Sequence, residues 1–367
     1  MNSEKEFLRK KNWWSDLDKY VFFPTLALIL FGAISIFSIS QHLTGKFYFS
    51  SNILLKKHLI FCVIGILTIV IISQFSLKNL IILSFFLFFL GIILSLSAIF
   101  FFPETKGANR WIKILGFSFQ PSELLKPSFI IVSSVLLGRY KRKSDYSILF
   151  NILALAVISI LLIFQPDYGM FILIFAAWFV QLLTSNMRLK IVLPIIISFF
   201  LIFIVVFFTL DHVKFRIMNF LFSEIGDNYQ ITKSLKSFSN GGLFGQGIGE
   251  SSIAKNLPDV HSDFIFALIA EELGTIISLF ILILYLTLYL RAHYIAQKCK
   301  NFFLITSLTG LSNILIFQVI INISSTLNII PTKGMTLPFI SYGGSSFISC
   351  SLIIGFILLL IKENKYA

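Results

Sequence analysis

The acid best placed for chemistry in this sequence is Asp263, within the segment His261-Ser262-Asp263-Phe264. A polar stretch ends at this segment, and a long apolar run begins directly after it. A carboxylate at such a boundary is partly removed from water, which favours its action as a general base. The residues alone also allow a structural role, because Ser262 or Asp263 could cap the helix that follows.

Two more acids, Glu271 and Glu272, follow about two helical turns further in, inside the same apolar run. Glu271 is on the face nearer to Asp263, since eight residues at about 100° each leave an offset of about 80°. Acidic side chains inside a membrane are costly, so each is expected to face a cavity or a partner. The sequence is consistent with a pair to Lys or Arg from another span and equally with a direct role in a site.

Cationic side chains occur in a second polar segment, which contains Arg110, Trp111, Glu123 and Lys126. Glu123 and Lys126 are three residues apart, so they can pair on one face of a helix. Arg110 and Lys126 would present positive charge to an anionic headgroup. The structural alternative is an interfacial capping device, in which Trp111 anchors the segment at headgroup level.

Glycine is abundant in two further polar segments. The stretch from Asn240 to Glu250 could bring backbone amides close to a ligand or form a tight re-entrant turn, and it lacks the Lys-Ser/Thr pair of a phosphate-binding loop. The stretch from Pro331 to Ser346 interrupts an apolar region with two prolines and three glycines. Broken backbone at membrane depth persists only where protein or a water-filled cavity satisfies it, so we expect a lined cavity with Lys333 at its rim.

The elements that must position these residues are transmembrane helices. Hydrophobic residues make up 57% of the 367 positions and charged residues only 13%, about half the charged share of a soluble domain. Because a bilayer-spanning helix needs about 20 apolar residues, we predict an all-α polytopic membrane protein with about ten spans. The apolar runs are 20–40, 58–74, 78–102, 124–138, 147–165, 169–184, 191–210, 263–290, 302–326 and 343–361.

The net charge of +13 does not indicate a nucleic-acid-binding protein, because the basic residues lie between the apolar runs. Compact basic clusters fall on one side of the membrane if both termini are cytoplasmic, as the positive-inside rule requires; Lys46, Lys56 and Lys57 are exceptions. We therefore expect cytoplasmic tails at 1–19 and 362–367 and a single transmembrane domain at 20–361. The segments placed on the outer face are 103–123, 165–169, 327–342 and a large loop at 211–262 between spans 7 and 8.

With these segments in view, nearly the whole chain resembles the SEDS family (shape, elongation, division and sporulation). Members are bacterial membrane glycosyltransferases that polymerise lipid II into peptidoglycan. The resemblance rests on six ordered motifs: Gly107-Ala108-Asn109-Arg110-Trp111-Ile112, Gln120-Pro121-Ser122-Glu123, Gln165-Pro166-Asp167-Tyr168-Gly169, His261-Ser262-Asp263-Phe264-Ile265-Phe266-Ala267, Glu271-Glu272-Leu273-Gly274 and Leu337-Pro338-Phe339-Ile340-Ser341-Tyr342-Gly343-Gly344-Ser345-Ser346.

The resemblance implies a catalytic role for Asp263, which would deprotonate the sugar 4-hydroxyl of the acceptor lipid II. That hydroxyl attacks the anomeric carbon of the donor, and a lipid-linked pyrophosphate leaves. Side chains expected to bind the pyrophosphate or sugar are Arg110, Trp111, Glu123, Lys126, His261, Lys333 and Ser341. The negative charge of the leaving group also suggests a divalent cation, Mg²⁺ or Mn²⁺, and no organic cofactor is expected.

The same resemblance implies partners and a location. We expect lipid II as substrate, membrane lipid around the helices, and a class B penicillin-binding protein that supplies transpeptidation, together with other membrane proteins of the divisome. The segment Pro331-Thr332-Lys333-Gly334 resembles division-type members, which places the protein in the inner membrane at the division septum. The alternatives are an elongation-type polymerase, a lipid II flippase, which needs no general base, and a scaffold that only recruits the transpeptidase.

Overall fold

The computed structural model describes residues 13–42, 51–104, 107–114, 117–141, 146–185, 189–209, 214–215, 218, 220, 229–331 and 334–365. Before the first outer segment come α2 (Trp13–Asp16), α3 (Lys19–His42), α4 (Ser51–Ser73) and α5 (Leu77–Phe101). A short antiparallel hairpin of β1 (Ile112–Ile114) and β2 (Phe117–Phe119) follows. The remaining elements are α6 (Ser122–Lys141), α7 (Tyr146–Phe164), α8 (Tyr168–Thr184), α9 (Leu189–Thr209), α11 (Tyr229–Gly241), η2 (Ala254–Asn256), α12 (Ile265–Lys298), α13 (Phe302–Thr326) and α14 (Gly344–Lys365).

Each predicted apolar run overlaps one long helix, so the all-α multi-pass fold class is confirmed. Seven helices in the described part of the chain are long and apolar enough to cross a membrane by themselves, and α8 is a shorter apolar helix. The count of ten spans stays a prediction. The β1–β2 hairpin was not predicted, because the sequence analysis placed these residues in an outer segment.

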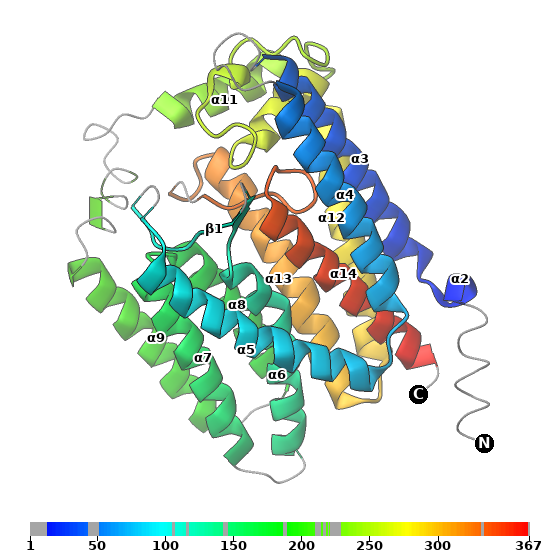
Figure 1. Ribbon diagram of the computed structural model, residues 1–367, viewed down its shortest axis with the longest axis vertical. Helices are drawn as coiled ribbons and strands as arrows, with labels where there is room; N and C mark the ends of the chain where they lie inside the picture. Colours follow the sequence, from blue (N-terminus) through cyan, green and yellow to red (C-terminus); the bar gives the residue numbers. More distant parts are fainter. Residues whose placement is uncertain are drawn as a thin grey trace.

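The described segments sort to two ends of the bundle as the charge alternation predicts. Figure 1 shows α2 and the C-terminal end of α14 near one end and α11 at the other. At the first end, Arg291 pairs with Asp18 at 2.8 Å, and Lys365 Nζ donates to Asp16 O at 2.9 Å. At the opposite end, which we call the loop end, Gln120 Nε2 donates to Asp167 Oδ2 at 2.8 Å and Tyr342 N donates to His261 O at 2.8 Å.

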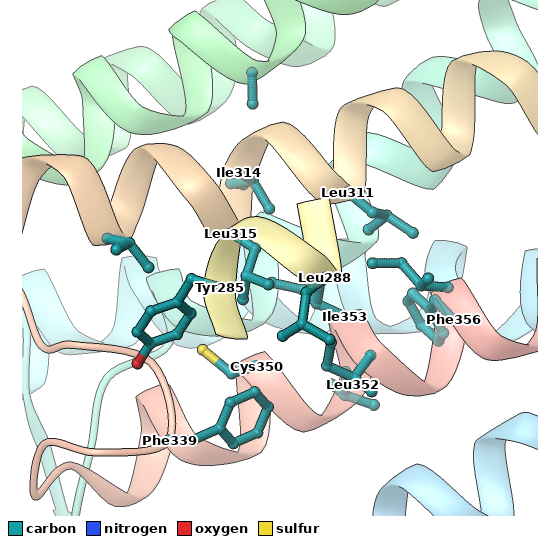
Figure 2. Close-up of a cluster of buried hydrophobic side chains, with 14 of the residues drawn as sticks. Tyr285, Leu288, Leu311, Ile314, Leu315, Phe339, Cys350, Leu352, Ile353 and Phe356 are labelled. Atoms are coloured by element: carbon teal, nitrogen blue, oxygen red, sulfur yellow. The ribbon is translucent and has the colours of Figure 1, made fainter. Parts of the chain in front are cut away.

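The core of the bundle is built around α14, which is buried along nearly its whole length. Figure 2 shows Tyr285 and Leu288 of α12, residues of α13, and Cys350 and Phe356 of α14 meeting in one cluster. Phe339 reaches this cluster from the loop that precedes α14. Because lipid supplies no hydrophobic drive between helices, close packing of this kind holds the bundle together.

Helix α12 is broken at Gly274, where φ is 80° and ψ is 176°. The glycine-rich stretch packs against the break: Gln246 N donates to Glu271 O at 2.9 Å, and Thr275 N donates to Gly242 O at 3.0 Å. A Cβ on Gly245 would lie 2.2 Å from Glu272 O, so only glycine permits this approach. The turn interpretation of this stretch therefore holds, because its amides bind helix carbonyls rather than facing an open site.

Contacts with α3 show how α12 lies along that helix. Ser38 Oγ, near the loop end of α3, donates to Glu272 Oε1 at 2.6 Å, whereas Arg291 contacts Asp18 just before the opposite end of α3. The half after Gly274 therefore runs the full length of α3. The expectation of one continuous span is wrong, because the helix that contains Glu271 and Glu272 is broken at Gly274. Both acids contact groups at the loop end, Glu272 through Ser38 and Glu271 through Ala254.

Candidate functional site

Asp263 lies in the turn before α12 and is half-buried. Its backbone N donates to Asp259 O at 3.0 Å. The capping position of α12 is Phe264, without a side-chain capping bond, so the capping alternative for Ser262 and Asp263 is wrong. Gly334 faces the carboxylate: a Cβ added there would lie 3.2 Å from Asp263 Oδ2. The Asp263 carboxylate therefore lies next to the backbone of a glycine, Gly334.

The His261-Ser262-Asp263 segment is held by the loop before α14. Tyr342 N donates to His261 O at 2.8 Å, and the two rings meet edge-to-face with centroids 5.8 Å apart. Ser341 Oγ donates to Ser262 O and accepts from Leu337 N at 2.8 Å. Ser341 is buried, and its hydroxyl is occupied by backbone groups in this conformation. Two motifs far apart in sequence are therefore joined at the site.

Two amides of α13, Gln318 and Asn322, line the same region and were missed by the sequence analysis. Gln318 Nε2 donates to Thr336 O at 2.9 Å, and Asn322 Nδ2 donates to Asp263 O at 3.1 Å. The sequence could have identified both residues, because they are polar side chains one helical turn apart in an apolar run.

Glu123 and Lys126 form the predicted pair, with Lys126 Nζ 2.5 Å from Glu123 Oε2. Lys126 is fully buried, and Nζ also donates to Gln318 Oε1 at 2.8 Å. Ser349 Oγ of α14 donates to Glu123 O at 2.7 Å. In this conformation the ammonium is not accessible to a ligand, and its charge is matched inside the bundle.

Arg110 forms a second ion pair beside the β1–β2 hairpin. Its Nη1 lies 3.5 Å from Asp167 Oδ1, and the Arg110 side chain remains 25% exposed. Asp167 also accepts from Gln120 Nε2 at 2.8 Å, and Gln120 N donates to Ser345 Oγ at 2.9 Å. Arg110 Nε is buried and has no hydrogen-bond partner among the described residues. Arg110 is therefore a partly exposed cation, and the partly exposed Trp111 follows it.

Glu271 is bound by the large outer segment rather than by a cation. Its carboxylate accepts from Asn240 Nδ2 at 2.7 Å, Ile253 N at 3.0 Å and Ala254 N at 2.6 Å. The expected pair with Lys or Arg is not seen among the described residues, because backbone amides of 252–254 take its place. Glu271 thus ties the outer segment to the half-helix that begins beside Asp263.

Lys333 lies outside the described residues, so its predicted place at the rim stays a prediction. In the described part of the chain, no three His, Cys, Asp or Glu side chains gather to hold a metal ion. What the geometry assembles is a half-buried carboxylate, a partly exposed arginine and buried polar side chains of α6 and α13. The substrate contacts assigned to these residues stay predictions.

The fold and this polar loop end define a multi-pass helical membrane protein with a candidate site built from loops and helix ends. Comparison with known proteins identifies its family. The family model for FtsW, RodA and SpoVE, described as cell cycle protein, matches residues 19–366. The chain belongs to this family.

Relatives and solved structures agree with this family. A protein of Caulobacter vibrioides named "Probable peptidoglycan glycosyltransferase FtsW" is 31% identical over 364 residues, covering 97% of this chain and 92% of its own length. A protein of the same name from Coxiella burnetii is 32% identical, covering 96% of this chain and 98% of its own length.

Among solved structures, a chain of a peptidoglycan synthase complex that coordinates polymerization and crosslinking has a TM-score of 0.76 at 22% identity, covering 96% of this chain and 99% of its own. The rod shape determining protein RodA of Thermus thermophilus has a TM-score of 0.68 at 23% identity, covering 95% and 97%. These likenesses establish the fold.

Proposed function

We propose that this protein is a peptidoglycan glycosyltransferase, which polymerises lipid II into glycan strands at the outer face of the cytoplasmic membrane during septal cell-wall synthesis. The observation that carries the proposal is the half-buried Asp263 carboxylate at the loop end of the bundle, facing the bare backbone of Gly334. The names of relatives about 30% identical over nearly the full chain support the same activity.

In the proposed reaction, Asp263 accepts the proton of the acceptor's sugar 4-hydroxyl as its oxygen attacks the donor's anomeric carbon. A new glycosidic C–O bond forms, and the bond from that carbon to the pyrophosphate oxygen breaks, so the lipid pyrophosphate leaves with the electron pair. A general base in this position contributes about 10²–10⁴-fold to a rate. We assign to the Arg110 side chain, which is 25% exposed, the role of stabilising the negative charge of the leaving group.

A divalent cation is part of the proposal only as an ion carried by the substrate. Mg²⁺ is commonly held by one or two carboxylates together with phosphate oxygens. The acids near the site do not fit a resident metal, because Asp167 is paired with Arg110 and Glu123 with Lys126. The cation would therefore arrive on the pyrophosphate, and no step depends on it.

We further propose a class B penicillin-binding protein as the partner that supplies crosslinking, with other divisome proteins at the septum. The likeness to a chain from a complex that coordinates polymerization and crosslinking supports such a partner. Relatives named FtsW rather than RodA support the division role over the elongation role.

The experiment that tests the activity measures glycan strands formed from labelled lipid II by the purified protein with its cognate transpeptidase. We expect Asp263→Asn to lose polymerisation by about 10²-fold or more, because the amide cannot accept the proton. Glu250→Gln is the matched control, since Glu250 is an exposed acid of the same outer segment, and it should retain the wild-type rate.

Full-rate polymerisation by Asp263→Asn would refute the proposed mechanism. If the wild-type protein moved lipid II across vesicle membranes without forming glycan, and Asp263→Asn did the same, the flippase alternative would be correct. A scaffold is distinguished in cells, where Asp263→Asn would support growth as long as the transpeptidase is still recruited.

A further inference from the structure

The polar face of α13 bonds to two consecutive backbone carbonyls of the segment before α14. Gln318 Nε2 donates to Thr336 O at 2.9 Å, and Asn322 Nδ2 donates to Met335 O at 2.6 Å. Both amides are only 1% exposed. They lie one helical turn apart and therefore point from the same face of α13. Buried amides in an apolar helix are costly unless their hydrogen bonds are made, so their partners indicate their role.

Asn322 makes a second bond that Gln318 does not, to Asp263 O at 3.1 Å. Both of its partners are carbonyl oxygens, which accept but cannot donate. The NH₂ group must therefore face them, and the orientation of the side chain is fixed. One amide group thus joins the backbone of Asp263 to the backbone of Met335.

This link matters because no regular element holds Asp263. Helix α12 begins only at Ile265, and the turn before it has no side-chain cap. The residue next to Met335 is Gly334, whose missing side chain leaves room for the Asp263 carboxylate at 3.2 Å from a Cβ position. Beside the bonds of Tyr342 and Ser341 to His261 and Ser262, Asn322 is the side chain that links the Asp263 backbone directly to the residue next to Gly334.

We propose that Asn322 is a positioning residue for Asp263, holding the carboxylate at a fixed distance from the Gly334 backbone. It does not touch substrate; it acts through the two backbone carbonyls that it binds. This inference rests on the proposed function and adds a residue to it. A general base that shifts by about 1 Å loses about 10²-fold in rate while the substrate still binds.

The test measures kcat and KM for lipid II with purified wild-type protein and its transpeptidase. Asn322→Ala should lower kcat by about 10–100-fold and leave KM within about twofold, because the base is displaced and the binding groups remain. Asn322→Asp should also lose kcat, since it keeps the shape of the side chain and places an acceptor oxygen where both N–H donors were. If the Asn322→Ala protein does not fold, Asn322→Asp is measured in its place.

The matched control is Asn313→Ala. Asn313 has the same side chain, lies on the same helix and is also buried. Among the described residues, its Nδ2 donates only within the helix, to Thr309 O at 2.7 Å. We expect this variant to keep the wild-type kcat. An Asn322→Ala protein as active as Asn313→Ala, or one changed in KM alone, would overturn the proposal.

Asp263→Asn is measured in the same assay to separate the two failures. If Asp263→Asn is inactive and Asn322→Ala is fully active, the result supports Asp263 as the general base and refutes the positioning role of Asn322. If Asp263→Asn polymerises lipid II at the wild-type rate, the proposed function of Asp263 itself is wrong.

Discussion

The Glu123–Lys126 pair and the Arg110–Asp167 pair lie at the same end of the bundle but differ in their access to solvent. Lys126 is completely buried within α6, with its ammonium bound by Glu123 and Gln318. Arg110 lies in a loop, and its side chain is 25% exposed. From the sequence alone, both cations are candidates for binding an anionic substrate. In the structure, the side chain of Arg110 is partly exposed and that of Lys126 is not.

The difference teaches that burial decides what a charge can do. A buried ion pair loses its water, and its partners must satisfy it fully, so removing one member leaves an uncompensated charge. A partly exposed pair contributes little to stability, but its cation can exchange one anion for another. The inner pair is therefore part of the packed core, and the proposed substrate role is kept for Arg110.

The largest expected effect sharpens this comparison through stability. Lys126→Ala should lower the stability of the folded protein by about 3–5 kcal/mol, because the Glu123 carboxylate is left buried without its cation. Thermal unfolding of purified protein in detergent measures the loss. Replacing Glu123 and Lys126 together by leucine should recover most of it, since no buried charge remains.

The control for this prediction is Lys113→Ala, which removes an exposed lysine of β1. A surface change of this kind should stay within about 0.5 kcal/mol of wild type. A Lys126→Ala protein as stable as Lys113→Ala would mean that the inner pair is not structural.

The next-largest expected effect is a weaker binding of lipid II when Arg110 is replaced. Arg110→Ala should leave the melting temperature near that of wild type and raise KM for lipid II by about tenfold, which corresponds to about 1.4 kcal/mol of lost binding. Steady-state polymerisation measures KM, and Lys113→Ala serves again as the control, because it removes a nearby exposed cation. If KM rose equally in both variants, general positive charge rather than Arg110 would be responsible.

The smallest effect is expected at Asp167. Its carboxylate caps α8 by accepting from Met170 N, and an asparagine caps a helix about as well. Asp167→Asn should therefore change stability by less than about 1 kcal/mol, whereas Asp167→Ala should cost about 1–2 kcal/mol. Thermal unfolding compares the two. Equal losses in both variants would show that the charge, and not the cap, is what Asp167 supplies.

The sequence predicted the class of protein and the place of its helices because both depend on local properties. Runs of about 20 apolar residues mark spans wherever they occur, and basic clusters mark one side of the membrane. The spacing of Glu123 and Lys126 predicted their pairing for the same reason, since residues three apart on a helix are neighbours. Asp263 stood out because a polar segment gives way to an apolar run at that residue.

Only the tertiary structure decided which of these residues remain accessible and how Asp263 is held. The break at Gly274 is invisible to hydropathy, because one glycine barely changes the average over an apolar run. The ammonium of Lys126 donates to Gln318 from another helix, and the link from Asn322 to Asp263 joins α13 to the turn before α12. Such contacts join residues far apart in the chain, so no local pattern records them.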